Sequence, residues 1–121
     1  MDKVTGTFTE LDLRVLDDKA DWFVVLKDFW YTRGEFTYLV EANTETDLAS
    51  IPKALRPFFS RTGKNIKAAV PHDHMYGMRY ATRKECDKLF YLMLLDLGVA
   101  KYKAWLFWAG VRAGGWTRGR W

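Results

Sequence analysis

The chain is organised around the stretch Val70-Pro71-His72-Asp73-His74-Met75-Tyr76. This stretch holds both histidines of the protein, one on each side of Asp73. Core packing alone would not gather imidazole, carboxylate and phenol groups in one run, because each polar group needs a partner once it is buried. We therefore expect the chemistry of the protein here, together with Thr46-Asp47-Leu48-Ala49-Ser50-Ile51-Pro52 upstream and Glu85-Cys86-Asp87 downstream.

Length and composition bound the architecture. A chain of 121 residues that is 49% hydrophobic can form one core, so we expect a single domain over 1–121, with strands mainly in 1–45, helices mainly in 50–115 and a tail at 116–121. The lone cysteine, Cys86, excludes an intramolecular disulfide and a cysteine-cluster zinc site. No signal-peptide run and no membrane-spanning run is evident in the sequence.

Charge is divided unevenly along the chain. Residues 1–52 carry 5 Lys and Arg against 11 Asp and Glu, whereas residues 53–121 carry 14 against 4. An acidic sheet beside basic helices accounts for this pattern, and so does a basic half that meets lipid head groups or another phosphate-rich partner. Nucleic acid is disfavoured, because the positive charge follows no recognisable binding motif.

The first third of the chain favours antiparallel strands. Residues 4–16 alternate apolar and polar side chains, as in a strand or a bent strand pair, and Asp17-Asp18-Lys19 is typical of a turn. Residues 22–31 and 36–40 are rich in β-branched and aromatic side chains around Thr32-Arg33-Gly34-Glu35, which predicts a β-hairpin.

Helical signals follow. Ser50 is a candidate N-cap for a short helix that Pro57 limits, and Asp47 offers a second capping oxygen. A second helix is predicted over residues 65–80, with Pro71 as a possible kink. Thr82-Arg83-Lys84-Glu85 is a capping box that starts a third helix, which ends at Gly98. A last helix spans about 100–113, with Tyr102, Trp105, Leu106 and Ala109 on one face and Trp105 expected in the core. The predicted class is α+β: a small antiparallel sheet, then three to four helices, the two central ones antiparallel.

The two central helices bring a base and a carboxylate together. His72 and Tyr76 are four residues apart and share a helix face, and Asp87 lies at the edge of the apolar stripe of the next helix. A histidine held by a carboxylate is the pair that general-base catalysis requires. The same residues could equally form a buried network that pins two helices.

The motifs Thr46–Pro52, Ala68–Val70 with His72, Asp73 and Tyr76, Cys86–Phe90, and Ala104-Trp105 with Val111-Arg112 resemble domain of unknown function 1353. That family consists of small proteins of tailed phages and prophages. The resemblance implies a virion- or tail-associated structural or assembly role, phage structural proteins as partners, and a location in the virion or host cytoplasm. A small intracellular effector that blocks host defence is a further alternative.

His72-Asp73-x-x-Tyr76, followed by Asp87, is also similar to the helix pair of secreted phospholipases A. That resemblance implies His72 as the base that activates water, Asp87 and Tyr76 as its supports, and Asp73 as a calcium ligand with Asp47 as helper. No glycine-rich calcium loop precedes His72, and calcium prefers six to eight oxygen ligands. Whether the protein is an enzyme stays open at this point.

Zinc is the weaker metal hypothesis. His72 and His74 diverge on a regular helix, so local unwinding at Pro71 would be needed before both could join Asp47 around one ion. The tryptophans Trp105, Trp108, Trp116 and Trp121 could form an interface patch, and the tail Trp116-Thr117-Arg118-Gly119-Arg120-Trp121 could dock on another subunit of an oligomer.

Overall fold

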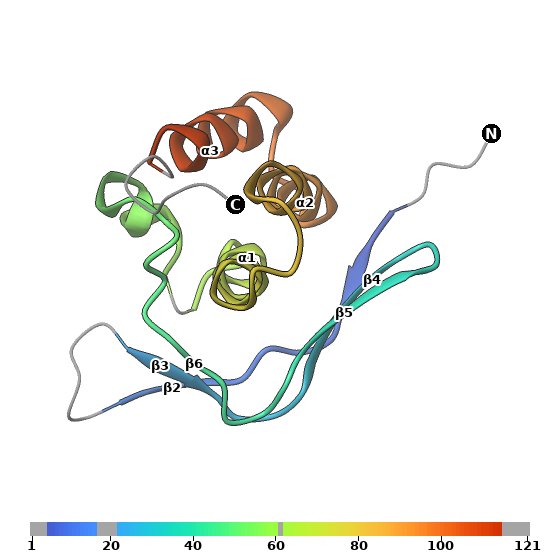
Figure 1. Cartoon of the computed structure of the whole chain (residues 1–121), viewed down its shortest axis with the longest axis vertical. Helices are drawn as coiled ribbons and strands as arrows, with labels where there is room; N and C mark the ends of the chain where they lie inside the picture. Colours follow the sequence, from blue (N-terminus) through green and yellow to red (C-terminus); the bar gives the residue numbers. More distant parts are fainter. Residues whose placement is uncertain (1–4, 17–21, 61, 115–121) are drawn as a thin grey trace. The chain divides into compact units, whose positions relative to one another are not determined.

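The computed structural model describes residues 5–16, 22–60 and 62–114 (Figure 1). The chain divides into two compact units, Met1–Asp47 and Leu48–Trp121. Among the described residues, the strands all lie in the first unit and the helices all lie in the second, which confirms the predicted α+β class and the order of its parts. The predicted turn at Asp17-Asp18-Lys19 and the tail at 116–121 lie outside the described residues.

Within its described residues, 5–16 and 22–47, the strand unit holds two three-stranded antiparallel sheets rather than the one small sheet predicted. Their strand orders are β1-β4-β5 and β2-β3-β6. The strands are β1 (Thr7–Phe8), β2 (Leu13–Val15), β3 (Phe23–Val25), β4 (Phe29–Arg33), β5 (Phe36–Val40) and β6 (Glu45–Thr46).

The predicted hairpin is confirmed as β4 and β5. Arg33 pairs with Phe36, so the turn consists of Gly34 and Glu35. Gly34 has a φ of 59°, a left-handed conformation that glycine adopts without steric cost and that tight hairpin turns require.

The predicted long strand over 22–31 is wrong, because it divides into β3 and β4 in different sheets. The interruption falls near Asp28, whose carboxylate accepts a hydrogen bond from the Ala42 amide at 2.9 Å. A side chain that binds the backbone in this way competes with the regular strand ladder.

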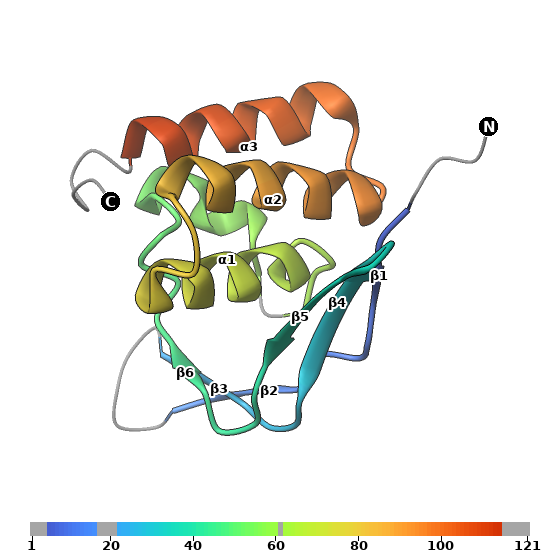
Figure 2. The same ribbon diagram turned by 45° about the vertical axis from the view of Figure 1, so that its right-hand side comes forward.

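The described part of the helical unit contains a 3₁₀ helix and three α-helices: η1 (Lys53–Phe58), α1 (Ile66–Met78), α2 (Arg83–Asp96) and α3 (Lys101–Gly114). α2 packs against both α1 and α3 and lies between them (Figure 2). Only residues 79–82 join α1 to α2, and the two helices run in opposite directions, as predicted (Figure 2).

The predicted helix capped by Ser50 is wrong in detail. The regular turns begin after Pro52, the residue at the N-cap, and no side chain caps them. Pro57 lies inside η1 rather than beyond its end. Ser50 does not cap because its side chain is directed to His72 instead, at 3.1 Å.

Pro71 does not interrupt α1, although it lacks the backbone N–H that an α-helix needs at this position. Ala68, Ala69 and Val70 before it and Met75 after it are all fully buried. A proline inside a helix costs about 3 kcal/mol, and we attribute its tolerance here to the packing of this buried face.

α2 begins as predicted. The Thr82 hydroxyl accepts a hydrogen bond from the Glu85 amide at 3.1 Å, and the Glu85 carboxylate accepts from the Thr82 hydroxyl at 2.8 Å and from its amide at 3.4 Å. Gly98 follows the helix with a φ of 86°, the left-handed conformation expected of it.

The buried face of α3 is the opposite of the one predicted. Ala104, Phe107 and Val111 are buried, whereas Trp105 is 55% exposed, so its expected place in the core is wrong. The predicted face, with Trp105, and the buried face, with Ala104, both have helical spacing. The smaller side chains of the buried face allow α3 to approach the rest of the unit closely. Gly110 also lies on this approach, since a Cβ there would come within 2.5 Å of the Leu55 side chain.

Candidate functional site

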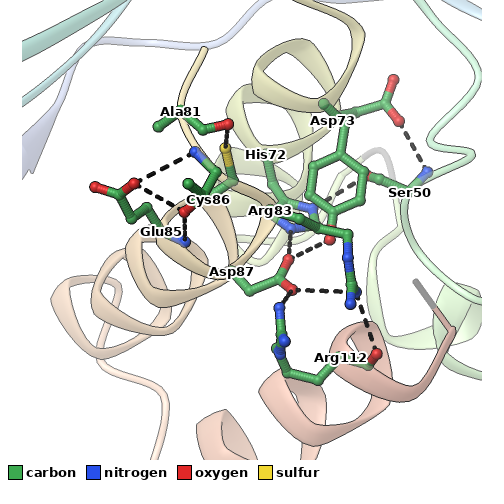
Figure 3. A network of polar contacts seen from close by, with 11 residues as sticks. Ser50, His72, Asp73, Ala81, Arg83, Glu85, Cys86, Asp87 and Arg112 are labelled. Carbon is green, nitrogen blue, oxygen red and sulfur yellow. Dashed lines mark hydrogen bonds and ion pairs between the residues drawn. The ribbon is translucent and has the colours of Figure 1, made fainter. Parts of the chain in front are cut away.

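His72 on α1 and Asp87 on α2 meet as predicted (Figure 3). Tyr76 on α1 joins them, also as predicted. His72 Nε2 lies 2.7 Å from Asp87 Oδ1, and the Tyr76 hydroxyl donates a hydrogen bond to the same oxygen. The His72 ring packs against the rings of Tyr76 and Phe90, with distances between ring centroids of 4.4 and 4.5 Å. These contacts fix the orientation of an imidazole that is completely buried.

Two arginines complete the surroundings of Asp87. Arg112 Nη1, on α3, lies 2.9 Å from Asp87 Oδ2, and Arg83 Nη1 lies 3.8 Å from the same oxygen. Arg83 also donates to the backbone carbonyl of Arg112 at 3.2 Å. Asp87 therefore joins all three α-helices through one buried carboxylate (Figure 3).

Ser50 brings a fourth segment into the network. Its side-chain oxygen lies 3.1 Å from His72 Nδ1, and its backbone amide donates to the Asp73 carboxylate at 2.9 Å. His72 thus has Ser50 on one ring nitrogen and Asp87 on the other. A water molecule would have to replace the Ser50 hydroxyl at Nδ1 before His72 could activate it, so this predicted role of His72 stays a prediction.

The charge on Asp87 decides where the protons lie. Burial raises the pKa of this carboxyl, but hydrogen bonds from His72, Tyr76 and Arg112 outweigh burial and lower it overall. An ionised carboxylate only accepts, so the bond to Asp87 requires a hydrogen on His72 Nε2. In the neutral tautomer with that hydrogen, Nδ1 is an acceptor and the Ser50 hydroxyl can donate to it. Burial and the bond to Asp87 raise the pKa of Tyr76, which keeps its phenol protonated as a donor.

A hollow of about 340 Å³ lies beside Ser50. Its lining consists of Ala49, Ser50, Ile51, Pro52, Lys53, Arg56 and Gly114. Gly114 permits a close approach of α3, because a Cβ there would lie 2.6 Å from the Pro52 side chain. Ser50 is 5% exposed. The serine therefore sits between the buried network and a hollow that carries two cationic side chains.

The residues predicted to bind a metal are not part of any group of possible metal ligands in the described residues. Within residues 5–16, 22–60 and 62–114, no three or more His, Cys, Asp or Glu side chains are grouped so that they could hold an ion. Asp73 instead accepts the Ser50 amide. The proposed unwinding that would bring His72 and His74 to one zinc ion is contradicted, because both lie in the continuous helix α1. Calcium binding by Asp73 and Asp47 stays a prediction.

Sequence reasoning missed three contributors. Arg83 could have been found, because it stands four residues before Asp87 on the same helix and such pairs are neighbours. Ser50 and Arg112 stood in the quoted motifs, Ser50 as a candidate cap, but no periodic spacing linked them to His72 and Asp87. Cys86, fully buried, fits the inert apolar role predicted, and burial raises the pKa of its thiol.

The network predicts a loss of stability in acid. A carboxyl whose pKa is lowered on folding contributes stability above its unfolded value of about 3.9, and this contribution is lost as the pH falls through the lower, folded value. We expect the difference in unfolding free energy between wild type and Asp87→Asn to be largest near neutral pH and to shrink below about pH 4. Urea unfolding between about pH 2.5 and 6 measures it. A constant difference would show that Asp87 is not ionised in the folded protein.

Comparison with known proteins places the chain in a family. The model of "Protein of unknown function (DUF1353)" matches residues 23–111, which include Ser50, His72, Tyr76 and Asp87. The chain belongs to this family, and the predicted resemblance is confirmed. An uncharacterized protein of Sinorhizobium fredii (strain NBRC 101917 / NGR234), y4iH, is 40% identical over 114 residues, a match that covers 92% of this chain and 46% of that protein. The chain thus spans about half the length of this relative. No solved structure matches.

Neither the family description nor the description of this relative names an activity or an association with phages. Among the described residues, no helix has the length and apolar character that crossing a membrane requires.

Proposed function

We propose that this protein is a hydrolase that acts by acyl transfer, with Ser50 as nucleophile, His72 as general base and Asp87 as the group that orients the base. One observation carries the proposal: Ser50 Oγ, the His72 ring and Asp87 form a continuous line, with contacts of 3.1 and 2.7 Å. A nucleophile beside a base that a third group orients is the arrangement that activates a serine.

The reaction balances with these groups. As Ser50 Oγ attacks the carbonyl carbon of an ester, its proton passes to His72 Nδ1, and the leaving alkoxide takes that proton as the ester C–O bond breaks. Water then gives a proton to Nδ1 and adds to the carbonyl carbon of the acyl-serine. As the bond between that carbon and Ser50 Oγ breaks, Oγ takes the proton back from Nδ1, which releases a carboxylic acid and restores the Ser50 hydroxyl. Asp87 stabilises the imidazolium that exists between the transfers.

Tyr76 and Arg112 are positioning residues in this scheme. Each hydrogen-bonds to Asp87, so they hold its charge and the tautomer of His72 without reaching the reacting atoms. Lys53 and Arg56 line the hollow beside Ser50, and their charge favours a substrate that carries an anionic group.

A structural role is the second candidate. The complete burial of His72 and Asp87 and the two arginines on Asp87 also suit a clamp that pins three helices. In a virion- or tail-associated assembly protein, as the family resemblance suggests, such a clamp would need no nucleophile. The reactivity of Ser50 separates the two candidates.

The test is covalent labelling with a fluorophosphonate probe, which forms a bond to the oxygen of an activated serine. The chain has only two serines, Ser50 and Ser60, and Ser60 is exposed. We expect mass spectrometry to find the label on Ser50, and labelling to disappear in Ser50→Ala but persist in Ser60→Ala. An unlabelled Ser50 in the folded wild-type protein would overturn the hydrolase and leave the clamp.

A further inference from the structure

The outer face of α3 exposes a row of large apolar side chains. Tyr102, Trp105 and Leu106 are 65%, 55% and 54% exposed, and their spacing places them on one side of the helix. The opposite side already supplies the core contacts of α3, through Ala104, Phe107 and Val111. α3 therefore carries a second apolar face that the folding of this unit does not use.

Two hollows flank this face. One, of about 680 Å³, is lined by Lys84, Glu85, Lys88, Tyr91, Trp105 and Trp108. The other, of about 690 Å³, includes Leu55, Phe58, Lys64, Tyr102, Lys103 and Leu106 in its lining. Each hollow thus combines aromatic or aliphatic walls with two lysines, and lysine stems can lie along apolar surface while their ammonium groups reach outward.

The charge of this surface selects its occupant. The two hollows are lined by Lys64, Lys84, Lys88 and Lys103 against one carboxylate, Glu85, so an anionic partner is complementary. A second copy docked through the same face would bring Lys84 and Lys88 against like charges. The hollow that Tyr102 lines also has aliphatic walls from Leu55, Val99 and Leu106, which suit acyl chains better than the base stacking of a nucleic acid.

We propose that the α3 face, defined as Tyr102, Trp105 and Leu106 with Lys84, Lys88, Lys64 and Lys103 around it, docks on the surface of an anionic lipid bilayer. Amphipathic helices with tryptophan on the apolar side and lysines beside it lie in the plane of the headgroup layer. The three apolar side chains would enter the boundary between headgroups and acyl chains, and the lysines would meet lipid phosphates. This inference does not depend on the reactivity of Ser50.

The test is co-sedimentation of the full chain with phosphatidylcholine vesicles that contain, or lack, phosphatidylglycerol. We expect binding only to the anionic vesicles and weakening between 0.1 and 0.5 M salt, since exposed charges are screened. The double variant Trp105→Ala, Leu106→Ala should lose at least about tenfold in partitioning, because less apolar area is buried. Lys84→Glu with Lys88→Glu should lose binding to the anionic vesicles.

Trp30→Ala is the matched control, because Trp30 is an exposed tryptophan of β4, at 39%, outside this face. It should bind vesicles as wild type does, and thermal melting should show that the α3 variants stay folded. Equal binding to neutral and anionic vesicles, or unchanged binding of folded α3 variants, would overturn the proposal. The proposal would also be overturned if the protein did not bind vesicles but bound an oligonucleotide or formed a dimer, and the same variants abolished that binding or that dimer.

Discussion

Asp87→Ala is expected to lower the free energy of unfolding by about 3–5 kcal/mol, the range for removing one partner of a buried ion pair. The alanine would leave Arg112 and Arg83 without their shared anion, and His72 and Tyr76 without their acceptor. The cost exceeds that of one lost hydrogen bond, because several buried donors lose their partner together. Urea unfolding at neutral pH measures it.

Asp28→Ala supplies the control for this experiment. The Asp28 carboxylate accepts the Ala42 amide in an exposed hydrogen bond, so its removal should cost about 0.5–1.5 kcal/mol. Asp87→Asn keeps the volume of the side chain and should fall between the two. If Asp87→Ala costs no more than Asp28→Ala, the network does not hold the helices together.

His72→Gln is expected to slow fluorophosphonate labelling of Ser50 by about 10²–10⁴-fold, the usual contribution of a positioned general base. Glutamine retains polar atoms that can bond to Asp87 and Ser50, but it cannot take the proton of the Ser50 hydroxyl at neutral pH. The measurement is the rate of label incorporation in protein that circular dichroism shows to be folded.

His74→Gln is the matched variant, since it changes the other histidine of the chain, two residues along the same helix. Its labelling rate should equal that of wild type. A folded His72→Gln protein that is labelled as fast as wild type would remove His72 from the mechanism. In that case a drop in Tm alone would identify the residue as part of a helix clamp.

Local patterns predicted the elements whose signals lie within a few residues. Gly34 marked the hairpin, Thr82 and Glu85 marked the start of α2, and Gly98 marked its end. These signals work because they act through backbone conformation and hydrogen bonds between near neighbours. Pro71 and Ser50 were misjudged where burial or a distant partner outweighed the local preference.

The choice of buried face on α3 shows the limit of pattern reading. Two sets of apolar residues on α3 have helical spacing. Hydrophobicity alone favours burial of the set with the larger side chains, which includes Trp105. The structure buries the smaller set, because Gly110 and Gly114 let α3 approach Leu55 and Pro52 closely. Shape complementarity between segments decides such cases, and it is not written in the spacing of one segment.

By itself, the sequence determined the α+β class, the family and the meeting of His72, Tyr76 and Asp87, since helix periodicity and a short connection bring these residues to facing surfaces. Only the tertiary structure placed Ser50 on the other nitrogen of His72 and Arg112 on Asp87. These partners lie 22 and 25 residues apart in the chain. Contacts at such separations depend on how whole elements pack, and that packing turned a predicted base with its carboxylate into a candidate nucleophile, base and carboxylate.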